Sequence, residues 1–220
     1  MNRSIKAFLT SITACVMAVS LSGCIVAAIP LIMVAAGAGV ALTGFVVYKS
    51  VQTSGGGNVR VAFGSTEKDK ATPPQPLPTA RDVSVWPGGQ REIRLVEKLQ
   101  AANAYRSVNL VRGVDAGGLG GADDQRAKAF DGACATQPVD LIFAAVDLGE
   151  KVDSNMLSFK RGSLTHKLNL VAYSCAQHKA VWVDAMAVIV ESGNNPTPQA
   201  EIDNIAADAW ADRLAMARGG

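Results

Sequence analysis

Hydrophobic residues in the C-terminal part of the chain change their spacing several times, and these changes mark the ends of the predicted elements. Apolar residues every three to four positions indicate an amphipathic helix, whereas alternation or a short apolar run indicates a strand. We expect helices at Arg91–Ala104, at Asp123–Thr136 and from Pro198 to Ala217. We expect strands at Val83–Trp86, Ser107–Val111, Val139–Val146, Ser158–Ser174 and Ala180–Glu191.

These elements follow the order β-α-β-α-β-β-β-α. Strands that are joined through helices run parallel. The last two strands are joined by a short turn at Cys175–Lys179 and therefore run antiparallel. The order predicts an α/β (α+β) domain over residues 81–218, with a mixed sheet of about five strands and three packed helices. An apolar membrane helix is expected to precede it.

The N-terminus has the pattern of an export signal. Met1–Lys6 carries two basic residues and no acid, and Ala7–Leu21 carries no charge. The run ends in Leu21-Ser22-Gly23-Cys24, which resembles the bacterial lipobox. This resemblance implies a signal peptide over residues 1–23 and a Cys24 that carries diacylglycerol through a thioether, with palmitate as a fatty acid. The alternative is a plain transmembrane helix that happens to contain a cysteine.

A second uncharged run, Ile25–Tyr48, follows directly. It exceeds the length of about 20 residues that spans a bilayer. We therefore assign residues 24–48 to the lipidated cysteine and a membrane-associated helix. Small residues in this run, among them Gly37, Gly39 and Gly44, would let two such helices pack closely. A passive helix beside the lipid anchor and a segment buried in a partner are the alternatives.

Residues 49–80 connect this segment to the domain. The apolar alternation at Val46–Gln52 and Asn58–Phe63, on either side of a glycine-rich turn, indicates a hairpin just outside the membrane. Four prolines between Gly64 and Ala80 favour extended polyproline II structure and disfavour a helix. We interpret this stretch as a linker or a long exposed loop.

Charge limits the classes of partner. Loss of Arg3 and Lys6 with the signal peptide takes the 21 Lys and Arg residues down to 19, which equals the 19 Asp and Glu residues. A nucleic-acid partner usually requires a basic face, so none is expected. The expected partners are the membrane, a protein of the cell envelope and further copies of this chain.

Two cysteines remain in the domain, and we expect them to form a disulfide. Cys134 lies just before the strand that begins at Val139, and Cys175 ends the next strand. If these strands are antiparallel, both cysteines lie at the same end of the sheet, within reach of a disulfide. An oxidising periplasm would favour such a bond.

The sequence shows no pattern that marks a catalytic or cofactor site. The stretch Gly117–Gly121 lies between a strand and a helix, as phosphate loops do, but it is followed by Asp123 and Asp124 rather than by Lys and Ser or Thr. The two histidines, His166 and His178, have no Cys or His cluster near them that suits a metal. We therefore expect neither enzyme activity, nor a metal, nor a cofactor.

The domain resembles a periplasmic α/β domain of outer-membrane lipoproteins. The resembling stretches are Val139–Val146, Lys167–Tyr173 and Lys179–Val183. The families concerned are the penicillin-binding-protein activator lipoproteins, the curli-secretion channel proteins and the TolB N-terminal domain. The resemblance implies a non-enzymatic binding or assembly role, by partner activation or within a secretion complex. The domain lacks an amphipathic membrane hairpin, which argues against a pore.

Two further functions remain as alternatives. One is a structural homo-oligomer held together by the Gly- and Ala-rich helix, and the other is an envelope hydrolase. Because Ile25 rather than Asp follows Cys24, the resemblance to enterobacterial sorting favours the outer membrane, facing the periplasm, over the inner membrane.

Overall fold

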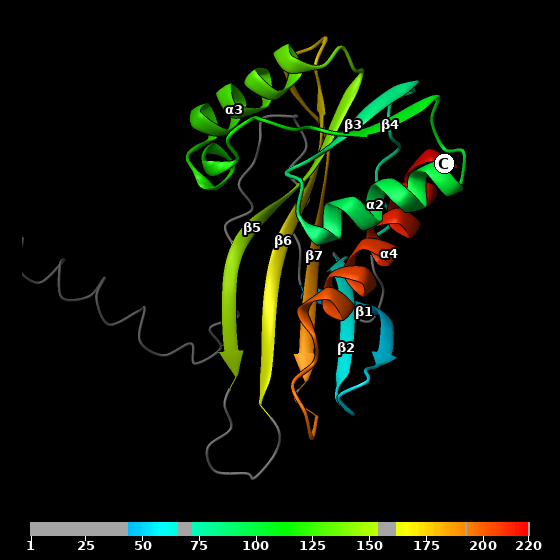
Figure 1. Cartoon of the computed structure of the whole chain (residues 1–220), viewed down its shortest axis with the longest axis vertical. Coiled ribbons are helices and arrows are strands. Elements are labelled where there is room, and N and C mark those ends of the chain that lie inside the picture. Colours follow the sequence, from blue (N-terminus) through cyan, green and yellow to red (C-terminus); the bar gives the residue numbers. More distant parts are fainter. Residues whose placement is uncertain (1–43, 66–71, 154–161, 192, 220) are drawn as a thin grey trace, which may run out of the picture. The chain divides into compact units, whose positions relative to one another are not determined.

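The computed structural model describes residues 44–65, 72–153, 162–191 and 193–219. Strands in these ranges form one seven-stranded mixed sheet, in the order β1-β2-β7-β6-β5-β3-β4 (Figure 1). Their bounds are Gly44–Gln52 for β1, Asn58–Ser65 for β2, Asp82–Trp86 for β3, Ser107–Leu110 for β4, Leu141–Asp153 for β5, Ser163–Ser174 for β6 and Lys179–Glu191 for β7.

Helices cover both faces of the sheet. Helices α2 (Gln90–Ala101) and α4 (Gln199–Arg218) pack together on one face, and α3 (Asp123–Thr136) lies on the other (Figure 1). A short 3₁₀ turn, η1 (Gly117–Gly120), precedes α3. The order of elements predicted for the domain is therefore confirmed, and so is its mixed α/β class.

The sheet has a parallel part and an antiparallel part, as the sequence predicts. Strand β3 pairs in parallel with both β4 and β5, and each of these connections passes through a helix. Strands β5, β6 and β7 pair antiparallel. Strand β5 extends far beyond its partner β3, which ends at the pair Trp86↔Ala144.

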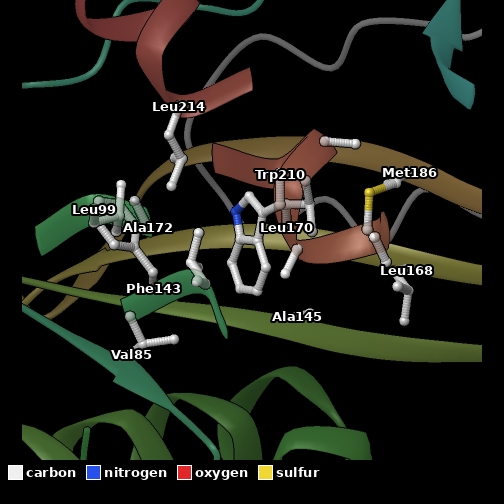
Figure 2. Close-up of a cluster of buried hydrophobic side chains, with 14 of the residues drawn as sticks. Val85, Leu99, Phe143, Ala145, Leu168, Leu170, Ala172, Met186, Trp210 and Leu214 are labelled. Carbon is white, nitrogen blue, oxygen red and sulfur yellow. The ribbon is translucent and has the colours of Figure 1, made fainter. Parts of the chain in front are cut away.

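The larger hydrophobic core lies between the sheet and helices α2 and α4. Trp210 of α4 is fully buried at its centre, against Phe143 of β5 and Leu170 of β6 (Figure 2). Leu99 of α2 and Leu214 of α4 lie nearby (Figure 2). Side chains of one strand point alternately to the two faces, so Phe143 and Ala145 enter this core while their neighbours face the other way.

The smaller core lies under α3. Phe130 of α3 stacks on Tyr173 of β6 with ring centroids 4.6 Å apart, and its edge meets Trp86 at 5.6 Å. Ile142 and Ala144 of β5 are fully buried in the same cluster. The two cores use alternate residues of the same strand, which explains why Leu141–Val146 is apolar throughout.

A buried ion pair ties α4 to the sheet. Nε of Arg213 lies 2.5 Å from Oδ2 of Asp184 on β7, and the side chains are only 4% and 12% exposed. The guanidinium also donates to the carbonyl of Thr72 and lies 4.6 Å from the ring centroid of Phe63. Burial raises the pKa of Asp184 above its ordinary value, although the bonds from Arg213 oppose that rise.

The described part of the proline-rich stretch, residues 72–80, packs against the domain. The backbone N–H of Leu77 donates to the carbonyl of Ala217 at 2.9 Å, and Nε1 of Trp182 donates to the carbonyl of Gln75 at 2.9 Å. Leu77 and Ala80 also contact the larger core. Prolines fix an extended backbone here, and its polar groups bond to the domain rather than to water alone.

The prediction of about five strands is wrong, because the β1–β2 hairpin joins the sheet. The pairing of β2 with β7 runs from Asn58↔Glu191 to Phe63↔Met186. The hairpin turn is also held by the residues that lead into α4. Asn195 N donates to Gly55 O at 3.1 Å, and a Cβ at Gly57 would lie 2.2 Å from the carbonyl oxygen of Glu191. Nothing larger than glycine fits such an approach.

The predicted membrane helix over 24–48 is corrected at its C-terminal end, where residues 44–48 form the start of strand β1. Gly44, expected to pack helices in a membrane, is the first residue of that strand. A short apolar run does not distinguish a strand from a helix, and pairing with β2 decides the matter. Residues 25–43 lie outside the described ranges. Within those ranges, no helix combines the length and the apolar character that crossing a membrane requires.

We predict that Arg213→Met lowers the free energy of unfolding by about 3–5 kcal/mol, since it leaves the Asp184 carboxylate buried without its partner. The double variant Arg213→Met/Asp184→Leu should lose clearly less free energy of unfolding than the sum of the losses in Arg213→Met and Asp184→Leu. Chemical denaturation of the two single variants and the double variant measures these losses. Arg94→Met is the control, because its ion pairs with Glu97 and Asp208 are partly exposed and should contribute less than about 1 kcal/mol. Additive losses in the double variant would contradict the prediction.

Candidate functional site

The residues predicted as functional fall into three groups. Cys24, Gly37 and Gly39 lie outside the described ranges. Gly44 begins β1 and is exposed. Cys134 and Cys175 form a disulfide, with the Cα atoms 5.5 Å apart. The sequence argument placed both cysteines at one end of the sheet, and the structure has them there.

This disulfide joins α3 to the turn between β6 and β7. Cys134 lies in the last turn of α3, and Cys175 directly follows β6. The backbone N–H of Cys175 donates to the carbonyl of Asp140 at 3.2 Å, next to the start of β5. The smaller core is therefore covalently closed at the end where the chain turns from β6 into β7.

Beside the disulfide lies a cluster of three polar side chains that the sequence did not reveal. Tyr173 donates its hydroxyl to Oδ1 of Asp131 at 2.8 Å, and Nδ1 of His178 lies 2.9 Å from the same oxygen. Asp131 comes from α3, Tyr173 from β6 and His178 from the turn, where its φ is +51°. His178 is solvent-facing, yet it is bonded to a helix far from it in the sequence.

The electrostatics of this cluster keep Asp131 ionised. Burial pushes the pKa of Asp131 upward, but the hydrogen bonds from His178 and Tyr173 outweigh it and hold that pKa below its usual range. Burial and the hydrogen bond to Asp131 raise the pKa of Tyr173. Because an ionised carboxylate only accepts, both Tyr173 and His178 donate to Asp131. The cluster therefore ties α3 to β6 and to the turn that follows it.

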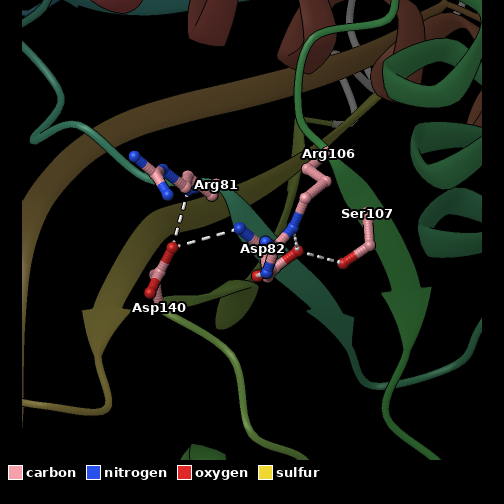
Figure 3. A network of polar contacts seen from close by, with 5 residues as sticks. All are labelled: Arg81, Asp82, Arg106, Ser107 and Asp140. Atoms are coloured by element: carbon pink, nitrogen blue, oxygen red, sulfur yellow. Dashed lines mark hydrogen bonds and ion pairs between the residues drawn. The ribbon is translucent and has the colours of Figure 1, made fainter.

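A second polar network lies where the parallel strands begin (Figure 3). Asp82 at the start of β3 binds the guanidinium of Arg106 and accepts from Oγ of Ser107 at 2.7 Å. Oδ2 of Asp140 accepts from the backbone N–H groups of Arg81 and Asp82 at 2.6 and 3.1 Å. Ligands of parallel sheets bind at the opposite, carboxyl ends of the strands. We therefore interpret this network as one that fixes the relative positions of β3, β4 and β5.

At the carboxyl ends of these strands, the glycine-rich stretch is held by a buried arginine. Arg126 of α3 is 5% exposed; it donates from Nε to the carbonyl of Leu119 at 2.9 Å and from Nη2 to the carbonyl of Gly121 at 2.8 Å. It also lies 3.0 Å from Oδ1 of Asp123. Residues Gly117–Gly120 form the 3₁₀ turn η1, and Arg126 binds one carbonyl of this turn and one directly after it.

At the N-terminus of α2, after the end of β3, a side chain of the protein itself occupies the space beside the helix end. Glu92 in the first turn is buried, with 2% exposure, and its Oε1 lies 2.7 Å from Nη2 of Arg91. Its Oε2 lies 2.7 Å from the position that a Cβ at Gly89 would take. A carboxylate at this place is favoured by the helix dipole, and it occupies the place where an anion could otherwise bind.

Acidic, His and Cys side chains do not gather in threes at metal-binding distances anywhere in the described ranges. The polar groups at both ends of the parallel strands are bonded mainly to other groups of the protein. The Asp131 cluster and the Asp82 network are both partly exposed, with the His178 side chain at 67% and the Arg106 side chain at 69%.

Comparison with known proteins gives a limited result. The sequence matches no family model and no curated protein. Two similar solved structures are PelC dodecamers from Paraburkholderia phytofirmans, each 11% identical. One, a point variant, covers 72% of this chain and 99% of its own at a TM-score of 0.39, and the other covers 74% and 97% at 0.37. The hypothetical protein CT253 from Chlamydia trachomatis is 12% identical and covers 64% and 100%, with a TM-score of 0.40.

At these scores the likeness carries no argument about function. PelC and CT253 are not among the lipoprotein types that the sequence resembles. That resemblance therefore stays an expectation from the sequence.

We predict that Cys134→Ser/Cys175→Ser lowers the free energy of unfolding by about 3–4 kcal/mol, the loop-closure contribution expected for cysteines 41 residues apart. Urea denaturation in oxidising buffer measures the loss. Reductant should weaken the wild-type chain by a similar amount and leave the double variant unchanged. Equal stability of the two chains in oxidising buffer would refute the contribution.

The Asp82 network predicts a pH dependence. Hydrogen bonds from Arg106 and Ser107 hold the pKa of Asp82 below its ordinary value of 3.8, so Asp82 stabilises the fold above that pH. The contribution is lost as the pH falls through the lowered pKa. We expect Asp82→Asn to be less stable than wild type at pH 7 and the difference to shrink below about pH 4. Urea denaturation across this pH range measures it, and a constant difference would contradict the assignment.

Proposed function

We propose that this chain is a lipoprotein of the bacterial cell envelope, anchored through a lipid on Cys24, that acts as a non-enzymatic binding or assembly factor. In this proposal the domain from β1 onward faces the periplasm, and the outer membrane is the more favoured location. Its partners are the membrane and an envelope protein.

The Cys134–Cys175 disulfide is the structural observation that carries the proposal. Disulfides persist in oxidising compartments such as the periplasm and are rare in a reducing cytosol. The bond closes the core under α3, so it belongs to the folded domain rather than to a surface appendage. It supports the same compartment that the lipobox Leu21-Ser22-Gly23-Cys24 implies.

The non-enzymatic part of the proposal is supported by the way in which the buried polar groups are used. Arg126 binds backbone carbonyls, and Arg213 binds a carboxylate and a carbonyl. Such groups hold segments together, which is a structural use of buried charge. Binding is therefore expected to use exposed surface of the domain.

We predict that the wild-type chain incorporates a palmitate analogue in a bacterial host and that Cys24→Ser does not. The thioether to diacylglycerol requires the Cys24 thiol, so serine removes the site of lipidation. Metabolic labelling followed by gel fluorescence measures the incorporation. Cys15→Ser is the matched control, since that residue lies in the expected signal peptide, and it should label normally. Labelling of Cys24→Ser would contradict lipidation at this residue.

The same cells test the binding role. Crosslinking in intact cells, followed by capture of the full chain from solubilised membranes, should recover one envelope protein reproducibly. That protein should be absent when residues 81–218 are deleted and retained when the Asp131 and His178 side chains are replaced by alanine. Recovery of the same protein with the deletion variant would show that the domain does not bind it.

A further inference from the structure

The antiparallel half of the sheet has an open strand at each side among the described residues. Strand β1 pairs only with β2, so its outer edge is free along its length. Strand β5 pairs with β3 only up to Ala144, so its outer edge is free from Ala145 to Asp153. Figure 1 shows these two strands at opposite sides of the five-stranded part. An open edge presents unpaired backbone N–H and C=O groups that can pair with another strand.

These two edges are linked by rows of residues that cross the sheet without interruption. One row runs Lys49↔Val61↔Val188↔His166↔Glu150, from the β1 edge to the β5 edge. Cross-strand partners share a face of the sheet. Lys49 and Glu150 therefore lie at the same level, on the same face, at opposite ends of one row. Glu150 is exposed, with His166 3.1 Å away, and Lys49 is partly accessible.

Three further rows of cross-strand partners also run without interruption from the β1 edge to the β5 edge. Val51 lies level with Val152 through the register positions Val59, Val190 and Leu164. Ser50 ends opposite Lys151, and Gln52 opposite Asp153. Both strands have an irregularity just before this region, between Val47 and Lys49 and between Asp147 and Glu150. The regular edges are therefore Lys49–Gln52 and Glu150–Asp153.

If one copy's β1 edge met another copy's β5 edge level with it, the ends of the first row would carry opposite charges. Lys49 would then lie beside Glu150. Strand direction also fits. Strands β5, β7 and β1 alternate with the antiparallel strands β6 and β2, so β1 and β5 run in the same direction. A copy related by simple rotation about the strand direction would add β1 to β5 in a parallel ladder, with its faces matched.

We propose that copies of this chain assemble head to tail, with the Lys49–Gln52 edge of one copy pairing in parallel with the Glu150–Asp153 edge of the next. Each copy then uses two different edges, and the contact repeats without a two-fold axis. The proposal deepens the assembly role given above but uses only the described domain. It can fail while lipidation of Cys24 and partner capture succeed, and the reverse also holds.

Cysteine crosslinking of the full chain tests the proposal. Adjacent strands lie about 4.8 Å apart, within the Cα separation of about 4.4–6.8 Å that a disulfide spans. Under mild oxidation, Lys49→Cys/Glu150→Cys should give a reducible ladder of dimers, trimers and larger species. Each single variant alone should stay monomeric, because like positions would lie about five strands apart. A mixture of the two single variants should stop at dimers.

Two controls and three outcomes make the test decisive. The wild-type chain gives the background from its own cysteines, and Glu97→Cys/Glu150→Cys has an exposed cysteine on α2 in place of Lys49; neither should form a ladder. Dimers from Lys49→Cys alone would mean a two-fold β1–β1 contact and would overturn the proposal. A crosslinked product whose mass is not a multiple of the mass of this chain would also overturn the proposal, and so would the absence of any product above background.

Charge reversal gives an independent readout that needs no thiol. Lys49→Glu and Glu150→Lys should each weaken self-association roughly tenfold by sedimentation, because each places like charges at the contact. The double reversal should restore association to within roughly threefold of wild type. Circular dichroism checks the fold of each variant, and both sites are at the surface. A double variant as weak as either single variant would show that the two residues do not meet.

Discussion

The contact of Arg213 with Asp184 holds together more of this structure than any other single interaction described above. The guanidinium comes from α4, the carboxylate from β7, the ring beneath it from β2, and the carbonyl of Thr72 from the proline-rich stretch. All four must be in place before the buried charge is satisfied. Because an unpaired buried charge is costly, the pair favours the arrangement in which hairpin, helix and proline-rich stretch are docked together. The core around Trp210 then lies between sheet and helix (Figure 2).

Much of the domain could be predicted from local patterns. The apolar run at Val139–Val146 indicated a central strand, and the structure places it between β3 and β6. The boundaries of α3 follow from the two aspartates at its start and the change of pattern after Thr136. The position of the hairpin did not follow, because the pairing of Asn58 with Glu191 joins residues far apart in the sequence. No periodicity within the hairpin reveals which strand it joins.

The polar sites also divide into those that the sequence predicts and those that only the fold reveals. Cys134 and Cys175 could be paired from the sequence because only two cysteines follow Cys24 and both flank predicted strands. Arg126 could not be foreseen, since its partners are backbone carbonyls, which the sequence does not distinguish. Asp131 appears in the sequence as an ordinary helical carboxylate, and only the fold brings Tyr173 and His178 to it. Gly44 was assigned to the wrong element, because hydropathy alone does not separate a strand from a helix.

The disulfide has a consequence for the time at which the domain reaches its full stability. A newly made chain in a reducing compartment has the same apolar residues and the same buried ion pair, but α3 is not yet linked covalently to the turn after β6. In that state the helix is held to the sheet by non-covalent contacts, among them the small cluster around Phe130 and the Asp131 hydrogen bonds. The unfolded chain also has more conformational entropy before oxidation than after it. The domain therefore reaches its full stability only after the thiols of Cys134 and Cys175 have been oxidised.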